Sequence, residues 1–403
     1  MKVKNYSVDE NKPDQDHFPC GQCGAELRFE PGTDHLKCNY CGHINLIEVE
    51  WSPIHEYDFH SALRKLEQLK DKPSKVISVL NCPSCGARFS LKPNEHAGSC
   101  PFCSAPAIIS SENARYIHPE SLLPFIIKEI QAQEIFDNWI ASRWFAPSAL
   151  KDKSKRDEKL TGIYLPYWTY DSDTDTRYQG MRGTVYYDRQ VYTAIVNGRP
   201  VRQVRNVPRV RWIPVSGKVY LHFDDVLIGA TKTLPRTIID NLHPWDLENL
   251  VPYTEAYLSG FRSEIYQVTL DQGFQQARSR MNSMITQRIH QDIGGDQQRI
   301  SARDTHHSDT TFKHLLLPVW SAAFKYKKKT YRFVINGRNG QIQGERPYSV
   351  VKITLSALFV ITLFIGMIVL MNDAGMFVST TTDPNLHQRF EQNYFPPVFE
   401  YGF

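Results

Sequence analysis

The stretch CGQCGAELRFEPGTDHLKCNYC, residues 20–41, contains two C-x-x-C pairs separated by fourteen residues. The stretch CPSCGARFSLKPNEHAGSCPFC, residues 82–103, repeats this arrangement 62 positions later, and these eight cysteines are all that the chain has. Paired C-x-x-C turns at a repeated separation fit tetrahedral four-thiolate zinc sites far better than four disulfides. We therefore predict two structural Zn2+ ions, one bound by Cys20, Cys23, Cys38 and Cys41 and one by Cys82, Cys85, Cys100 and Cys103.

The two stretches agree beyond their cysteines, since Ala87 matches Ala25 and Pro93 matches Pro31. This agreement predicts an internal duplication, with zinc ribbons over 17–57 and 76–110 joined by a helical linker over 58–75. A glycine follows the second cysteine of a pair at Gly24 and at Gly42, where a metal-binding turn favours a residue without a side chain. The nearby histidines are expected to lie at the surface and not on the metal: His17, His35 and His43.

The charge of the chain argues against a phosphate-binding role for the ribbons. The formal charge is +4 with neutral thiols, but eight thiolates and two Zn2+ change it by −4. From residue 16 to residue 58 there are eight acidic side chains against Arg28 and Lys37. A nucleic-acid surface needs uncompensated cations, so we expect protein partners for the ribbons.

A single membrane span is predicted near the C-terminus. Residues 353–371 contain no charge for 19 positions, about 28 Å as a helix at about 1.5 Å per residue, and we place the span at 351–372. Lysines and arginines precede it, whereas Arg389 is the only basic residue of the tail 373–403. This asymmetry predicts a cytoplasmic body and an extracytoplasmic tail. The polar segment 1–16 has no apolar core of a secretory signal and is expected to be disordered.

The segment 111–348 is predicted to be an α+β body rich in strands. Helical periodicity covers 128–145 and 270–293, and the second helix is expected to end at Gly294 and Gly295. Four stretches between 161 and 223, separated by Gly, Asn and Asp, predict a meander or half-open barrel. A charged loop is expected at 151–159 and a polar loop around His306 and His307. The similar sequences LPYW (165–168) and LPVW (317–320) suggest a second, fainter duplication.

Motifs of enzymes are missing from the sequence. No phosphate-binding glycine loop, serine elbow or H-E-x-x-H sequence occurs, so we predict that the protein is not an enzyme. Two weak candidates remain. His222 with Asp224 and Asp225 could form an acid/base group, and the histidines expected in exposed loops could bind a metal weakly: His306, His307 and His314.

The most basic stretch lies at 199–211, and the spacing of its arginines leaves two interpretations open. Its arginines could bind an anionic ligand such as acidic lipid headgroups or RNA, or they could form the solvated face of a hairpin. The residues are Arg199, Arg202, Arg205, Arg209 and Arg211. A second basic group, residues 327–329, is expected in a hairpin turn where it contacts headgroups and sets topology.

Several longer motifs together resemble one protein family. They are CGQCGAELRFEP, WFAPSAL, GIYLPYWTYD, RWIPVSGKV, FDDVL, HPWDLENLVPY, YLSGFRSEIY and LPVW, followed by one terminal apolar helix. This combination is similar to the bacterial membrane-anchored zinc-ribbon proteins, and the resemblance covers nearly the whole chain to about residue 371. Members often carry a label borrowed from the primosomal helicase, and some lie beside phage-shock and flotillin-like membrane-stress proteins. The family brings no catalytic residues, and the motor motifs of a helicase do not occur here.

These observations predict a non-enzymatic adaptor on the inner (plasma) membrane of a bacterium. It would be anchored by one span, hold two structural Zn2+ ions, and bind proteins at the cytoplasmic face in membrane-stress or membrane-organising assemblies. The alternative is a membrane-tethered nucleic-acid binder that uses the ribbons together with the arginine-rich hairpin.

Overall fold

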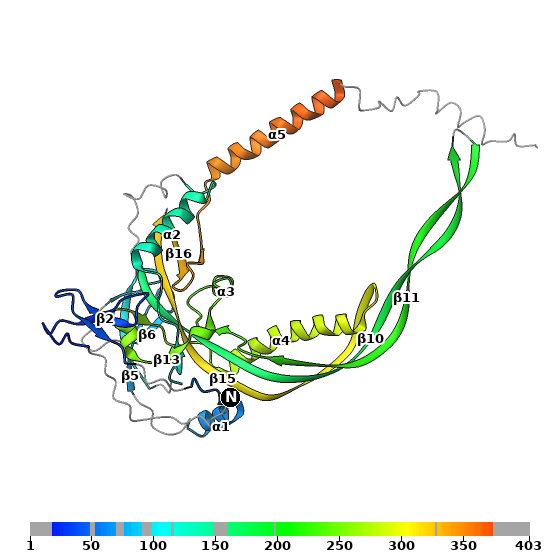
Figure 1. The fold of residues 1–403 in the computed structure, drawn as a ribbon. Helices are drawn as coiled ribbons and strands as arrows, with labels where there is room; N and C mark the ends of the chain where they lie inside the picture. The colour runs from blue at the N-terminus through cyan, green and yellow to red at the C-terminus, as the bar shows by residue number, and fades with distance from the viewer. Residues whose placement is uncertain are drawn as a thin grey trace, which may run out of the picture. The chain divides into compact units, whose positions relative to one another are not determined.

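The computed structural model describes most of the chain (Figure 1). The described residues are 18–48, 53–69, 76–90, 98–113, 117–147, 160–196, 199–326 and 329–373. They fall into two compact units, one of residues 1–143 and 148–347 and one of residues 144–147 and 348–403. Several predictions lie outside the described residues, namely those for 1–16, His17, 151–159, 327–328 and the tail from 374 onward.

A long antiparallel sheet forms the centre of the first unit, with its main strands in the order β11-β10-β15-β16-β17. These strands are β10 (Thr161–Val196), β11 (Arg199–Phe223), β15 (Gln297–Tyr326), β16 (Lys329–Asn336) and β17 (Ile342–Gly344). Short strands extend it, namely β4 (Tyr57–Asp58), β9 (Ser121–Leu122), β12 (Ile228–Gly229), β13 (Val251–Pro252) and β14 (Arg262–Ser263). The predicted α+β class with a sheet-rich body is confirmed.

The predicted meander or half-open barrel between 161 and 223 is wrong. The four stretches form only two strands, β10 with 36 residues and β11 with 25, paired without interruption from Ser172↔Phe223 to Val196↔Arg199. The glycines that suggested turns lie inside β10, where backbone or side-chain atoms of neighbouring strands approach closely. A Cβ at Gly180 would lie 2.5 Å from the carbonyl oxygen of Arg299, and one at Gly183 would lie 2.8 Å from Val210 Cγ1. Glycine within a strand can mark such an approach as well as a turn.

The two L-P-x-W sequences lie side by side in the centre of the sheet. Leu165 of β10 is directly opposite Leu317 of β15. Both tryptophans are buried, and each indole N–H donates to a backbone carbonyl, Trp168 to Val268 at 2.9 Å and Trp320 to Ile127 at 2.8 Å. The structure therefore pairs the similar motifs in the centre of the sheet, while their common origin stays a prediction.

The helices of this unit cover the central sheet. They are α1 (Phe59–Gln68), α2 (Glu129–Ser142), α3 (Arg236–Asp240) and α4 (Leu270–Ile293), with 3-10 turns η3 (Leu247–Asn249) and η4 (Glu255–Leu258). α4 has the predicted bounds, with Thr269 accepting from Gln272 N at its start and Gly294 at φ 64° at its end. Its apolar stripe is buried against β10 and β11. The prediction of a polar loop after this helix is wrong, because His306 and His307 lie within β15.

Two smaller sheets contain the cysteine pairs. Ribbon 1 has β1 (Leu27–Phe29), β2 (His35–Cys38) and β3 (Ile44–Leu46) in sequence order. Ribbon 2 has β5 (Val76–Asn81), β6 (Arg88–Ser90), β7 (Gly98–Ser99) and β8 (Pro106–Asn113) in the order β6-β5-β8-β7. In both ribbons the cysteines lie in the turns and at the strand ends.

The second unit contains α5 (Val350–Asp373) and the short segment Trp144–Pro147. Within it, Lys352 Nζ donates to the carbonyl of Ala146 at 2.8 Å, and Ser349 N donates to that of Phe145 at 2.8 Å. The 22 residues Val350–Met371 have a mean hydropathy of 2.7 and none of them is buried. A helix of this length and composition could span a membrane.

Candidate metal centres

The four sulfurs of ribbon 1 converge on one point. Cys20 and Cys23 lie in the turn before β1, Cys38 ends β2, and Cys41 lies in the turn before β3. The Sγ atoms of Cys20 and Cys41 are 3.5 Å apart, as are those of Cys23 and Cys38, and all four lie within 4.8 Å of one another. The predicted turn glycines have the left-handed conformation, with φ of 74° at residue 24 and 76° at residue 42.

Ribbon 2 repeats this geometry. The Sγ atoms of Cys82 and Cys103 are 3.4 Å apart, and those of Cys85 and Cys100 are 3.5 Å apart. Gly86 has φ 75°, but the position that matches the second glycine of ribbon 1 is Ser104, with φ 58°. A serine in this conformation carries a steric cost that glycine does not.

These distances fit a metal ion bound by four thiolates. Bonds of about 2.3 Å from zinc to sulfur place the corners of a tetrahedron about 3.8 Å apart, close to the observed separations and far from the roughly 2.05 Å of a disulfide. All eight cysteines are free of disulfides. In ribbon 1, hydrogen bonds from the backbone N–H groups of Cys41 and Tyr40 lower the pKa of Cys38 to about 6, which favours the thiolate.

The two clusters differ in exposure. In ribbon 1, Cys20 and Cys38 are buried while Cys23 and Cys41 are exposed. In ribbon 2, three cysteines are buried and Cys85 is half-buried. An aromatic pair, Phe89 and Phe102, stacks beside this second cluster at 5.7 Å between ring centroids. Chelators should therefore reach the ribbon 1 site more readily.

Each ribbon is joined to the central body by backbone and side-chain contacts. In ribbon 1, Phe29 N donates to Ser259 O at 3.1 Å, and Ser259 Oγ donates to Leu27 O at 2.6 Å. In ribbon 2, Ile265 N donates to Arg88 O at 2.9 Å, and Gln267 Nε2 donates to the carbonyl of residue 86 at 2.9 Å. The ribbons are therefore parts of one compact unit with the body.

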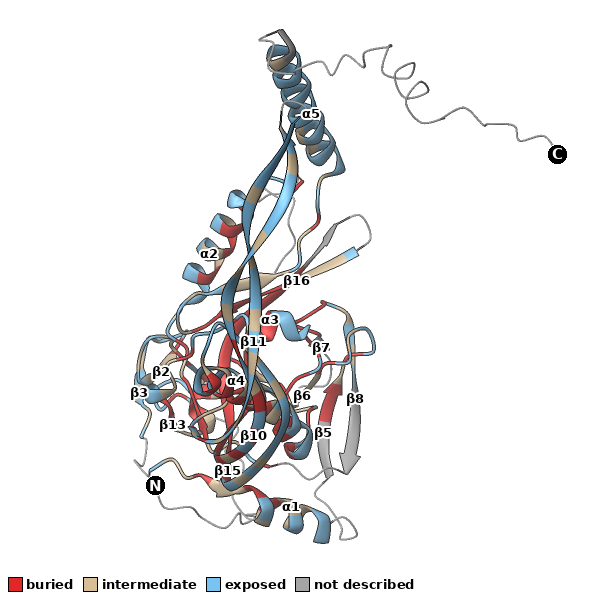
Figure 2. Ribbon diagram, turned by 90° about the vertical axis from the view of Figure 1, so that its right-hand side faces the viewer, coloured by how far each residue is buried: buried red, intermediate tan, exposed pale blue. Residues whose placement is uncertain are grey.

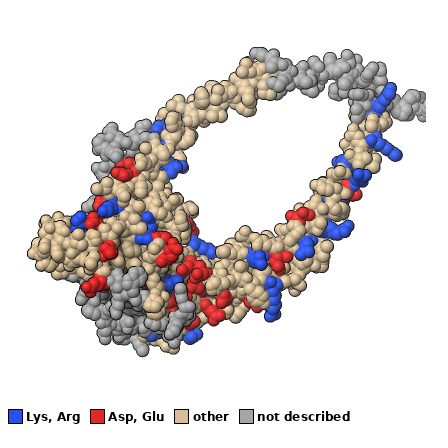
Figure 3. Space-filling view, in the orientation of Figure 1, with Lys and Arg blue, Asp and Glu red and all other residues tan. Residues whose placement is uncertain are grey.

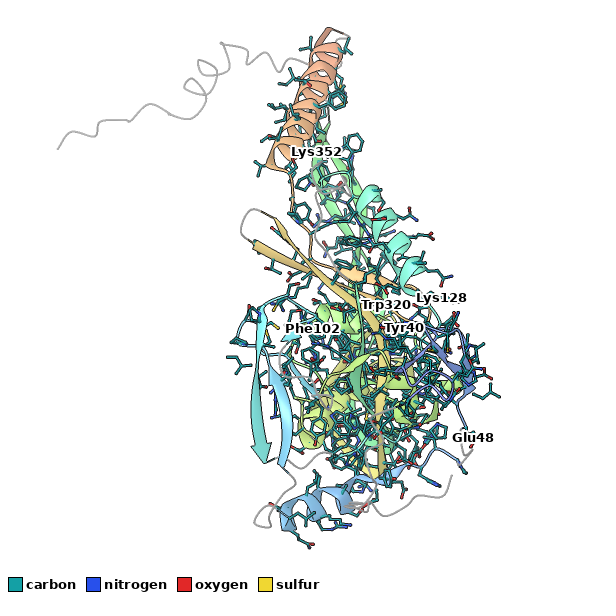
Figure 4. All side chains as sticks on the ribbon, turned by 90° about the vertical axis from the view of Figure 1, so that its left-hand side faces the viewer. Tyr40, Glu48, Phe102, Lys128, Trp320 and Lys352 are labelled. Atoms are coloured by element: carbon teal, nitrogen blue, oxygen red, sulfur yellow. The ribbon has the colours of Figure 1, made fainter. Side chains whose placement is uncertain are left out.

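The ribbons cover opposite faces of the central sheet, and Figures 2 and 4 show one on each side of β15. The alternation along the strands explains this arrangement. On one face, the hydrophobic cluster that includes residues of ribbon 1 contains Tyr164, Leu316 and Trp320. Their neighbours Ile163, Leu165, Leu315, Leu317 and Val319 pack in the cluster that contains ribbon 2. Each face at the centre of the sheet is thus covered in part by a ribbon that contains a cysteine cluster.

Among the residues that the structure describes, no histidine belongs to either cluster. His35 lies beside Glu30 and Asp34, with nitrogen–oxygen distances of 3.4 and 3.6 Å, and His43 is half-buried in ribbon 1. The prediction that neither would be a ligand agrees with this grouping.

The acid/base group suggested by the sequence is not assembled. His222 is exposed, and its Nδ1 lies 2.7 Å from Asp173 Oδ1, a hydrogen bond that raises the pKa of His222. Asp224 and Asp225 instead lie near Asp171, whose pKa burial raises to about 6.

Sequence reasoning missed the buried cation beside these acids. Lys313 Nζ lies 2.7 Å from Asp225 Oδ1 and 3.1 Å from Glu56 Oε1, and only 7% of the Lys313 side chain is exposed. The signal available was a lysine between Phe312 and the apolar run that leads into the second L-P-x-W sequence. A buried cation bonded in this way compensates the acids and holds β15 to the segment before β4.

The three histidines that were predicted in an exposed loop do not lie in one. They are His306, His307 and His314. His314 is buried, its Nδ1 lies 2.7 Å from the Ile117 carbonyl oxygen, and burial lowers its pKa to about 4. His307 lies 3.3 Å from Ser172 Oγ, and His306 is exposed on the same strand. The reason for the error is that polar residues continue β15 where they pair with the polar half of β10.

The arginine-rich stretch lies on β11, in the part of the hairpin that runs beyond β15. All five arginines are exposed, as expected for a solvated hairpin and equally for a binding face: Arg199, Arg202, Arg205, Arg209 and Arg211.

Comparison with known proteins finds one similar sequence to report. It is named "Uncharacterized protein YdjG" and comes from Bacillus subtilis (strain 168). It is 24% identical over 246 residues, which are 60% of this chain and 68% of that protein. No protein-family model matches the chain, and no solved structure matches it.

Proposed function

We propose that the protein is a non-enzymatic scaffold of the bacterial membrane-anchored zinc-ribbon type, which binds other proteins at the cytoplasmic face of the plasma membrane. Both four-cysteine clusters hold structural Zn2+ in this proposal. Four sulfurs complete a tetrahedral shell, so no coordination position is left for water or substrate. Support for a stabilising role comes from the position of each cluster over one face of the central sheet.

The membrane anchor in this proposal is α5. Its support is the unburied apolar stretch Val350–Met371, with basic residues before it along the chain. The excess of positive charge on that side favours a cytoplasmic body and an extracytoplasmic C-terminal tail. The similar protein comes from a bacterium, which supports only the bacterial part of the proposal.

One observation carries the protein-binding part of the proposal. Ribbon 1 presents Tyr40, Ile44 and Leu46 to solvent, with exposed fractions of 86%, 52% and 72%. Ile44 and Leu46 point to the same side of β3, which is an outer strand of its three-stranded sheet. An outer strand with exposed apolar side chains is a suitable surface for another protein chain. Tyr40 and the acidic Glu48 are labelled on this ribbon in Figure 4.

Affinity capture from detergent-solubilised membranes tests this function. The wild-type chain should recover specific membrane proteins, and Ile44→Asp with Leu46→Asp should lose them. Ile108→Asp is the matched control, because Ile108 is an exposed isoleucine of ribbon 2 with an exposed fraction of 62%. Recovery of the bait alone, or the same proteins with the ribbon 1 variant, would refute the proposal.

The arginines of β11 favour a second candidate, a membrane-tethered nucleic-acid binder. Phosphate contacts by several arginines would give an affinity that falls steeply with salt. The purified full chain in detergent should then shift DNA or RNA in a salt-dependent manner, and Arg205→Glu with Arg209→Glu should abolish the shift. An absent shift at low salt would remove this candidate.

A further inference from the structure

The far part of the β10/β11 hairpin is a two-stranded arm, with no third strand of the described residues beside it. We define the arm as residues 184–196 and 199–211, because β15 ends its pairing with β10 at Gly183↔Gln297. Thirteen residues at about 3.3 Å each give a length of about 40 Å. Two strands alone are only marginally stable in water. Most side chains of the arm are exposed and are not covered by the core.

The register divides the arm into two different faces. Residues directly opposite in an antiparallel pair share a face, and Tyr187↔Pro208, Val191↔Val204 and Ile195↔Pro200 are such pairs. The face they form is mainly apolar and also contains Val185, Val210, Arg189, Thr193, Arg202 and Asn206. The exposed fractions of residues 187, 191, 195 and 204 are 67%, 64%, 79% and 62%. We call this the apolar face of the arm.

The other face of the arm has most of the arginines together with Tyr186 and Tyr192, and it also contains Ala194, Val201 and Val207. It contains four of the five arginines predicted as an anionic patch, namely Arg199, Arg205, Arg209 and Arg211. The guanidinium of Arg205 lies 5.5 Å from the ring centroid of Tyr192, and that of Arg211 lies 5.4 Å from Tyr186. Six arginines and one aspartate give residues 184–211 a formal charge of +5, and basic side chains are visible along the arm in Figure 3.

We propose that the arm binds a membrane surface that contains anionic lipids, with its apolar face in the interfacial layer and the four arginines of its other face at the level of the headgroup phosphates. An amphipathic segment in this position buries its apolar side about 5–10 Å deep, and its basic side then remains among the headgroups. Tyrosines such as Tyr186 and Tyr187 are common at this depth. The inference rests on the proposed membrane anchoring.

Charge and chain length favour a bilayer over other occupants. Nucleic acid would account for the arginines but would leave the apolar face in water. A second copy would cover the apolar face but would bring two arms of charge +5 together. Only five residues, 345–349, join β17 to α5, a distance of at most about 20 Å, so an anchored α5 keeps the body beside lipid.

The edge of the arm also argues against pairing with another strand. Pro200 and Pro208 in β11 have no N–H to donate to an added strand. The β11 edge of the arm is therefore a poor template for an added strand, whereas its exposed apolar side chains lie on its face.

Photo-crosslinking of the full chain in vesicles tests the inference. p-Benzoylphenylalanine replaces Tyr187 on the apolar face or, as the matched control, its neighbour Tyr186 on the basic face. In vesicles of phosphatidylcholine with phosphatidylglycerol, we expect phospholipid adducts by mass spectrometry at position 187, several-fold above position 186. In the chain with p-benzoylphenylalanine at position 187, Arg205→Glu with Arg209→Glu should lower the yield of lipid adduct, by about fivefold for each arginine lost.

The outcomes separate this inference from the proposed anchoring. Flotation of the same protein with the vesicles after alkaline extraction reports on α5 alone. Protein that floats but gives no lipid adduct at 187, or equal adducts at 186 and 187, overturns the arm proposal and leaves the anchor intact. Crosslinks between two copies in place of lipid adducts also overturn it, because they identify a second chain as the occupant. Protein that does not float overturns both.

Discussion

The carboxyl group of Glu264 is buried between ribbon 2 and the central sheet, and its replacement by glutamine should change how stability depends on pH. The residue is 2% exposed, and its Oε1 accepts hydrogen bonds from Thr231 and Thr233. Its Oε2 has no hydrogen-bond partner within the part of the chain that the structure describes. Burial raises its pKa to about 8, despite the two hydroxyl donors. The protonated, neutral form is therefore the one that suits the folded protein at neutral pH.

The magnitude follows from linkage. Because the pKa of Glu264 is raised on folding, its contribution to stability is complete below the unfolded value of about 4.5 and is lost as the pH rises toward 8. Each pH unit in that window costs about 1.4 kcal/mol, so wild type should lose roughly 3–4 kcal/mol between pH 5 and pH 8 through this group. Glu264→Gln keeps an oxygen for the two threonines and should lose none of it.

The assay is chemical unfolding of the full chain in detergent with zinc present. Tryptophan fluorescence monitors the unfolding at several pH values. Zinc affinity also changes with pH, so zinc is kept at saturating concentration for wild type and variant at every pH value. Glu248→Gln, at an exposed carboxylate of η3, is the control. Parallel pH profiles for wild type and Glu264→Gln would refute the reasoning.

Three other predictions concern the clusters and the buried cation. Elemental analysis should find two zinc atoms per chain, and Cys82→Ser should lose one and unfold ribbon 2; one zinc or none in wild type would contradict the assignment. Ser104→Gly should raise the free energy of unfolding by about 1 kcal/mol, since it relieves a left-handed serine; an unchanged or lower value would show that the turn is not strained. Lys313→Met should cost about 3 kcal/mol because it leaves Glu56 unpaired in the interior, and adding Glu56→Gln should recover part of the loss. A full cost in the double variant would mean that packing, and not charge, is responsible.

The sequence alone determined the features that depend on short spacings. Two C-x-x-C pairs fourteen residues apart place four sulfurs together whatever the rest of the chain does, and the structure contains both clusters. The apolar stripe of α4 and the uncharged run of α5 likewise lie within one element each. Such patterns can be read locally because helix geometry relates residues only three or four positions apart.

Tertiary structure decided the length of the strands and what each face contacts. The glycines and polar residues between 171 and 196 indicated turns, yet β15, more than 100 residues later, continues the pairing to Gly183, and β11 continues it to the end of β10. His306 and His307 became strand residues for the same reason. The division of the arm into apolar and basic faces depends on this register, because alternation assigns a side chain to a face only after its partner strand is known.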